Sequence, residues 1–239
     1  MTAVPAVEAL LFDVFGTVVD WRGSIARLGA AFAEGRDLPP VDWAAFADAW
    51  RARYQPAMAE VREGRRPFVR LDVLHRENLD AILADFGLES LSAAERDELN
   101  LFWHRLDPWP DSVAGMTRLK RRLILAAQSN GNIGLIVDMA KYGGLPWDVV
   151  LGAEVVGAYK PRPEAYLGAC ERLGRAPGRC LMVAAHNDDL AAAADCGLRT
   201  AFVRRPEEKA PGETYDLVPT GDWDLVVDSL DELADRLGC

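Results

Sequence analysis

Asp13 is the residue whose position most clearly suggests chemistry. It follows the apolar run ALLF of residues 9–12 and opens the segment Asp13-Val14-Phe15-Gly16-Thr17. A buried strand that ends in a lone carboxylate places it at the carboxyl edge of a sheet, where ligands bind in open α/β proteins. With a reference pKa of about 3.9, this carboxylate is ionised at neutral pH and can act as a nucleophile. An Asp that only caps the following turn would give the same pattern.

Three further polar clusters follow predicted strands. Ser129 and Asn130 come after residues 123–127, Lys160 comes after residues 149–153 and a short loop, and the stretch HNDD of residues 186–189 comes after residues 180–185. Carboxyl ends of parallel strands meet at one edge of a sheet, so we expect these clusters and Asp13 to form a single site.

The elements that must hold this site alternate in the second half of the chain. Such β-then-α repetition predicts a Rossmann-like α/β fold, a parallel sheet covered by helices, with the Asp13 strand in that sheet. The predicted strands are 123–127, 149–153, 180–185, 200–203 and 225–227, and the predicted helices are 133–142, 163–173, 189–196 and 230–237.

The segment between residues 20 and 107 has a different pattern, with helical periods and no convincing strand. The periods cover residues 25–32, 43–61, 69–86 and 93–104. An all-helical insert after the first strand predicts a cap over the carboxyl edge. We expect a core of residues 1–19 and 105–239, a cap of residues 20–104, and an exposed loop at residues 205–214.

Composition excludes several classes of partner. The chain has 239 residues, half of them hydrophobic, and a formal charge of -10, which argues against binding to nucleic acid or an anionic membrane surface. Four well-separated cysteines indicate neither a zinc site nor a disulfide framework, as expected for a cytoplasmic protein. No segment reaches about 18 uninterrupted apolar residues, so we expect no membrane span.

The order of the four clusters, with a helical insert after the first, resembles the haloacid dehalogenase superfamily over nearly the whole chain. Within it, FDVFGT of residues 12–17, SNG of 129–131 and YKP of 159–161 followed by Tyr166 look like the hydrolytic 2-haloacid dehalogenases. Trp50-Arg51 adds a match, since that family carries an arginine there. Dimers are usual in the family.

The resemblance implies a reaction in which a short 2-haloacid and water become a 2-hydroxy acid and halide, without a metal or organic cofactor. Asp13 would attack C2, Lys160 would hold Asp13 in its charged form, and Arg51 would attract the departing halide. Asp189 would orient the hydrolytic water, and His186 could position that water or donate to halide. Candidate substrate-binding residues are Val14, Phe15, Thr17, Ser129, Asn130, Tyr166 and Asn187.

Two features of the sequence differ from related families, one from the phosphatases and one from the commonest dehalogenase pattern. Phosphatases of the superfamily carry a second Asp where this chain has Phe15, because a departing alcohol needs a proton and halide does not. The family's SSNxxD turn is here AAHNDD, residues 184–189, so His186 stands where the family has Asn. A magnesium-dependent phosphatase using Asp188 and Asp189 as ligands, or a non-catalytic binding protein, stays open.

Large rings indicate the size of the pocket. Phe15, Trp50, Tyr54 and Phe68 suggest a tight pocket that favours haloacetate, including fluoroacetate.

Overall fold

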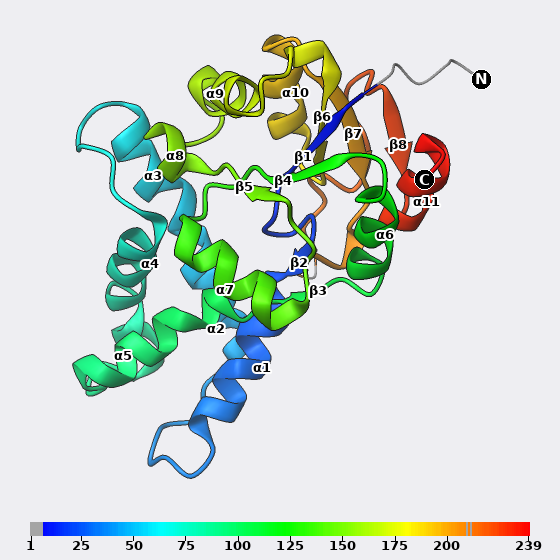
Figure 1. The fold of residues 1–239 in the computed structure, drawn as a ribbon. Coiled ribbons are helices and arrows are strands. Elements are labelled where there is room, and N and C mark those ends of the chain that lie inside the picture. Colours follow the sequence, from blue (N-terminus) through cyan, green and yellow to red (C-terminus); the bar gives the residue numbers. More distant parts are fainter. Residues whose placement is uncertain (1–6, 209, 211) are drawn as a thin grey trace.

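A six-stranded parallel sheet forms the core of the computed structural model, which describes residues 7–208, 210 and 212–239 (Figure 1). The first six residues of the predicted core lie outside the described residues. The spatial order is β5-β4-β1-β6-β7-β8, and each neighbouring pair is parallel. The strands are β1 Ala9–Phe12, β4 Ile124–Ala127, β5 Val149–Val150, β6 Cys180–Ala184, β7 Arg199–Val203 and β8 Leu225–Val227. The predicted α/β class and all six strands are therefore confirmed.

Alternation along β1 divides the core into two layers. Leu10 and Phe12 pack in one hydrophobic cluster with residues of α6, α7 and α11, whereas Ala9 and Leu11 pack in a second cluster with residues of α9 and α10. Successive side chains of a strand point to opposite faces, so a strand that is apolar throughout must be covered on both. The covering helices are α6 Ser112–Leu119, α7 Ile133–Gly143, α9 Pro163–Leu173, α10 Asn187–Asp195 and α11 Leu230–Leu237.

Two predicted core elements have bounds that differ by two residues or more in the structure. The predicted strand 149–153 ends as β5 at Val150, and a short helix α8, Ala153–Val156, begins there instead. Gly152 makes this turn possible, since a Cβ at that position would lie only 2.4 Å from the Ser129 carbonyl oxygen. Helix α10 begins two residues before the predicted position because the Asp216 carboxylate accepts from the Asn187 N–H at 2.9 Å.

The cap is helical, as predicted, but its first helix is longer than expected and each of the other three expected helices is divided in two. Its elements are α1 Trp21–Ala33, α2 Trp43–Ala52, α3 Tyr54–Arg62, α4 Leu71–Asp80, η1 Leu83–Phe86, α5 Ala93–Asn100 and η2 Leu101–His104. The predicted helix 43–61 breaks at Arg53 because Pro56 has no N–H to bond Ala52 and its ring would clash with that carbonyl. Helix α5 starts with a capping box between Ser92 and Glu95.

A two-stranded antiparallel pair joins the cap to the core, where we expected no strand. Strand β2, Val19–Asp20, pairs with β3, Asp107–Pro108, so the chain enters and leaves the helical insert side by side. The Asp20 side chain also accepts from the Gly23 N–H and caps α1. The boundaries at 20 and 104, which lie beside this pair, stay a prediction. No helix within the described ranges combines the length and apolar character needed to cross a membrane.

Helices α6 and α11 lie side by side through a close contact at Gly115 (Figure 1). A Cβ there would lie 2.5 Å from the Leu230 carbonyl carbon, so we expect Gly115→Ala to lower the free energy of unfolding by about 1–3 kcal/mol through overpacking. Gly134→Ala on exposed α7 meets no atom closer than 3.8 Å, and should raise stability by a few tenths to about 1 kcal/mol. Urea unfolding measures both; equal effects would contradict the close-contact explanation.

Candidate active site

A cavity of about 610 Å³ lies where the carboxyl edge of the sheet meets the cap. It brings together eight of the twelve predicted site residues. These are Asp13, Phe15, Arg51, Asn130, Lys160, Tyr166, His186 and Asp189. The other four, Val14, Thr17, Ser129 and Asn187, are buried residues that are not among those lining the cavity.

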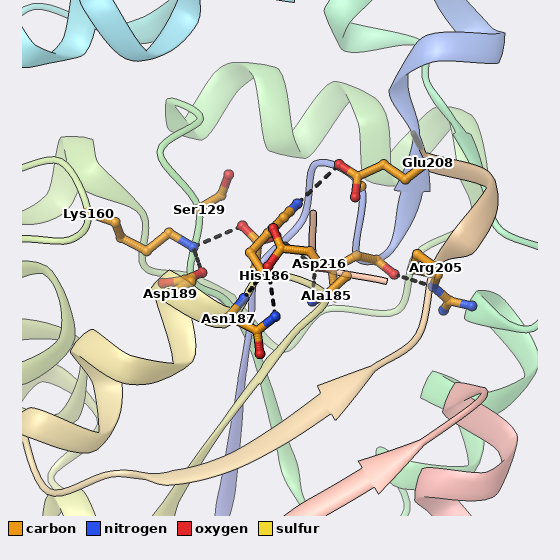
Figure 2. Close-up of polar contacts among 12 residues, drawn as sticks. Ser129, Lys160, Ala185, His186, Asn187, Asp189, Arg205, Glu208 and Asp216 are labelled. Carbon is orange, nitrogen blue, oxygen red and sulfur yellow. Dashed lines mark hydrogen bonds and ion pairs between the residues drawn. The ribbon is translucent and has the colours of Figure 1, made fainter. Parts of the chain in front are cut away.

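The Lys160 ammonium joins two carboxylates at the centre of the site (Figure 2). Its Nζ lies 2.9 Å from Asp13 Oδ1 and also contacts Asp189 Oδ2. The Tyr166 hydroxyl donates to Asp189 Oδ1 at 2.5 Å. All three charged side chains are buried, so these contacts act in a medium of low effective dielectric. The loop before α9 thus supplies the ammonium, and the end of β1 and the start of α10 each supply one of the carboxylates that contact it.

The second oxygen of Asp13 is held by two different donors. Thr17 Oγ1 donates to Asp13 Oδ2 at 2.7 Å, and His186 Nδ1 lies 3.1 Å from the same oxygen. The Ala185 N–H donates to Thr17 Oγ1 at 2.9 Å, so the threonine proton is directed to Asp13. Oδ1 accepts from Lys160 alone among the described residues and keeps a free lone pair for attack.

Burial and charge oppose each other at the two carboxyls. Burial raises the pKa of Asp13, but the charge of Lys160 and the hydrogen bond from His186 outweigh it and hold that pKa well below its usual range. At Asp189, burial and the charge of Asp13 raise the pKa against the opposing effect of Lys160. The same carboxylates raise the pKa of Lys160 despite burial. Asp13 is therefore ionised beside a fixed cation.

His186 lies between Asp13 and Glu208, and Figure 2 shows its contact with Glu208. Its Nε2 is 3.0 Å from Glu208 Oε1, which also accepts from Trp21 Nε1 at 3.2 Å. Burial lowers the pKa of His186, but the charge of Glu208 and the hydrogen bonds to Glu208 and Asp13 raise it to about 10. The ring is an imidazolium at neutral pH and donates from both nitrogens.

Glu208 was missed because residues 205–214 were expected to form an exposed loop, and this expectation was wrong for their first part. Arg205 and Glu208 are buried, and η4, Pro206–Glu208, carries the carboxylate to the site. Arg205 makes a bidentate pair with Asp111 and donates to the Thr17 carbonyl. Residues 209 and 211 lie outside the described ranges. The signal was available, since this segment follows β7 at the same carboxyl edge.

The structure does not support substrate contact by Asn187. Its Oδ1 accepts from the Thr220 N–H and from Trp223 Nε1, at 2.9 and 3.0 Å. Its Nδ2 donates to Asp216 and to the Val218 carbonyl, at 2.8 and 3.0 Å. Both polar atoms of the amide are therefore occupied within the chain. Asn187 anchors the loop before β8 to the start of α10.

Ser129 and Val14 also make hydrogen bonds to nearby backbone N–H groups. Ser129 Oγ accepts from the Gly131 N–H at 3.0 Å, and the Val14 carbonyl accepts from the Val18 and Val19 N–H groups. The neighbouring Asn130 differs, because it lines the cavity and its Oδ1 accepts from the Lys160 N–H at 2.8 Å. That bond orients the amide and leaves its NH₂ group as a donor.

Arg51 enters the cavity from α2. Its guanidinium carbon lies 4.0 Å from the centre of the Tyr54 ring and 5.3 Å from that of Trp21. No salt bridge joins Arg51 to a carboxylate among the residues the structure describes, and its buried Nη1 has no hydrogen-bond partner there. A cation held by aromatic faces with an unused donor is suited to bind an anion.

Phe15 forms an aromatic wall with edge contacts to Tyr54 and Trp103, at centroid distances of 6.4 and 5.7 Å. The tight pocket expected from the large rings is not what forms. Trp50 and Phe68 are absent from the described lining, and the cavity of about 610 Å³ is wide for a haloacetate. Trp50 of α2 lies in the hydrophobic cluster instead, and Phe68, in the connection between α3 and α4, packs against it.

Within the described ranges, no group of three or more His, Cys, Asp and Glu side chains is arranged to hold a metal ion. Asp188 is an exposed side chain at the rim, whereas its neighbour Asp189 contacts Lys160.

Comparison with known proteins identifies the class. The family model of haloacid dehalogenase-like hydrolases matches residues 7–197, so the chain belongs to that family.

Among individual relatives, a defluorinating L-2-haloacid dehalogenase of known structure is 50% identical, with a TM-score of 0.94, over 98% of this chain and 96% of that one. A second L-2-haloacid dehalogenase structure is 46% identical, with a TM-score of 0.94, over 97% of this chain and 99% of that one. (S)-2-haloacid dehalogenase 4A of Burkholderia cepacia is 28% identical over 84% of this chain and 85% of its own length.

The charged state of His186 is testable by NMR of isotopically labelled histidine. In the wild-type protein we expect its pKa to be about 10. In Glu208→Gln the pKa should fall toward the reference of about 6.5, because one of two neighbouring charges is lost. An unchanged value would contradict this assignment.

The same shift has a consequence for stability. The folded pKa lies above the unfolded value, so the protonated ring stabilises the fold fully below about pH 6.5. This contribution is lost as the pH rises through about 10. It should be smaller in Glu208→Gln.

Proposed function

We propose that this protein is a hydrolytic 2-haloacid dehalogenase that works through an ester on Asp13. The observation that carries the proposal is the arrangement of charges in one cavity, with an ionised Asp13 held by Lys160 and, on the cap side, Arg51, whose Nη1 has no hydrogen-bond partner among the described residues. The dehalogenases among its relatives support the same activity. The reaction would convert a 2-haloacid and water to a 2-hydroxy acid, halide and a proton.

In the first step, Asp13 Oδ1 attacks C2 from the side opposite the halogen. A C–O bond forms, the carbon–halogen bond breaks, and the electron pair leaves with the halide. Arg51 and the NH₂ group of Asn130 are the donors we assign to the departing halide, since both residues line the cavity and Arg51 Nη1 has no hydrogen-bond partner among the described residues. Phe15 shields the reacting carbon from water.

In the second step, water attacks the carbonyl carbon of the Asp13 ester. Negative charge then develops on the carbonyl oxygen Oδ2, where Thr17 and His186 already donate. We assign the proton of the attacking water to Asp189, which Lys160 and Tyr166 orient. Asp189 returns that proton to the departing alkoxide oxygen, so the 2-hydroxy acid leaves, and the second proton of the water is released as the Asp13 carboxylate re-forms. Esterification in the first step removes the charge of Asp13, so the pKa of His186 should be lower in the ester intermediate than in the free enzyme.

The phosphatase alternative lacks a required group. Phosphate monoester hydrolysis produces an alkoxide that needs a proton, and the position two residues after Asp13 holds Phe15, packed against Tyr54 and Trp103. The binding-protein alternative does not account for a carboxylate that is held charged and has an oxygen free for attack.

The reaction is tested by halide release from chloroacetate, fluoroacetate and each enantiomer of 2-chloropropionate, with EDTA present. Asp13→Asn should lower kcat on the order of 10³-fold or more, because the amide cannot form the ester. Fluoroacetate belongs in the panel because one relative is a defluorinating enzyme. Magnesium-dependent phosphate release without any halide release would overturn the proposal.

A single turnover in heavy-oxygen water is the matched mechanistic control. The solvent oxygen should enter the Asp13 carboxylate in the first turnover, because water attacks the ester carbonyl. It should appear in the hydroxy acid only in later turnovers. The product should have inverted configuration at C2. Retained configuration would rule out direct displacement by Asp13.

We also propose a cytoplasmic homodimer. The four cysteines are free, as in a reducing compartment.

The dimer would form through exposed apolar side chains on α4, η2 and α7. These are Val73, Leu101, Ile133 and Val137. The three elements lie together, because Asp72 of α4 bonds Asn132 before α7 and η2 packs on α7. A second copy would cover this apolar face. Light scattering of the wild type should give twice the chain mass, and Val137→Lys should lower the measured mass toward that of one chain. A wild-type monomer would contradict the dimer.

A further inference from the structure

Arg62, at the end of α3, brings a second cation into the cavity that the proposed reaction does not use. It lines the same cavity as Asp13. Its Nη1 donates to Gln55 Oε1 at 3.1 Å and to the Lys160 carbonyl at 3.3 Å, and its Nη2 lies 3.4 Å from the Gln55 carbonyl. The guanidinium is therefore held in a fixed orientation on the backbone of the central lysine.

The charge of Arg62 is not neutralised by these contacts. All three acceptors are uncharged oxygens, and no salt bridge joins Arg62 to a carboxylate among the described residues. Burial lowers the pKa of the half-buried guanidinium, the direction expected for a cation that lacks a counter-ion. A guanidinium has five N–H donors and three acceptors are present, so donors remain for a ligand.

The position of Arg62 relative to Asp13 sets the length of that ligand. Arg62 contacts the backbone of Lys160, whereas the Nζ of the same lysine contacts Asp13. Arg62 and Asp13 thus contact opposite ends of one lysine residue, so a ligand that reaches both must extend past the lysine side chain. A haloacetate bound at Asp13 leaves much of the roughly 610 Å³ unfilled.

Four acidic residues that line the cavity have other surroundings. Asp48 forms a bidentate pair with Arg22, and Asp216 accepts from both nitrogens of Asn187. Glu213 accepts from the Ala210 N–H. Asp188 is exposed at the rim.

We propose that the preferred substrates are 2-halodicarboxylates, in which the carboxylate at the far end of the chain binds Arg62 while C2 lies at Asp13. Planar bidentate pairing with a carboxylate is the interaction for which a guanidinium is best suited. This inference rests on the proposed dehalogenase function, and it extends that function from the reacting centre to the rest of the substrate.

The test compares 2-chloroglutarate with 2-chlorovalerate, which has the same chain length but no second carboxylate. We expect the wild-type kcat/KM to be at least tenfold higher for the dicarboxylate, mainly through KM. Arg62→Gln should remove most of this preference, and Arg62→Lys should retain part of it. Arg65→Gln is the matched control, because Arg65 is an exposed neighbour paired with Glu60. This variant should leave kcat/KM unchanged for both substrates.

Three results would overturn the inference. These are equal wild-type kcat/KM values, a preference that survives in Arg62→Gln, or equal losses for both substrates in that variant. Equal losses would show that Arg62 only clamps the cap or attracts anions in general. Melting temperatures identify variants that fail to fold.

If the wild type released no halide even from chloroacetate, the proposed function would fail by itself. Calorimetric binding of 2-hydroxyglutarate against 2-hydroxyvalerate would then decide the role of Arg62. Tighter binding of the dicarboxylate, lost in Arg62→Gln, would support it, and equal binding would refute it.

Discussion

The contact of one buried ammonium with two buried carboxylates is the interaction on which the site depends. Lys160 lies between Asp13 and Asp189, and none of the three could stay charged at this depth without the others. The net charge of the trio is negative, and the protonated His186 balances it from the far side of Asp13. Because each partner comes from a different segment, the whole sheet edge must be assembled before Asp13 has its reactive form.

The cap supplies what the sheet edge lacks. The core contributes most of the acidic groups, whereas the arginines that face the cavity, Arg51 and Arg62, come from α2 and α3. One hydrophobic cluster runs from Phe12 of β1 through Phe15 to Trp50 and Trp103 of the cap. This shared core ties the position of the two arginines to the position of Asp13, and the short β2–β3 pair joins the cap to the core as well.

The segment between β7 and β8 forms the remaining wall. Arg205 anchors its start through Asp111, Glu208 reaches His186, and Asn187 holds its later part through Asp216 and Val218. Each of these bonds crosses at least 22 positions of sequence. Segments far from Asp13 in the chain therefore control the protonation of the histidine beside it.

The amino-acid sequence alone determined the class of fold, the six strands and the convergence of Asp13, Lys160, His186 and Asp189, because strand periodicity and polar strand ends are local signals. Only the tertiary structure decided which polar side chains are free. Asn187, predicted to bind substrate, instead hydrogen-bonds through its amide to the loop before β8. Glu208 and Arg62 face the cavity from segments whose sequence is typical of a charged surface. The physical reason is that hydrogen-bond partners and counter-ions are set by long-range packing, which no local pattern of residues encodes.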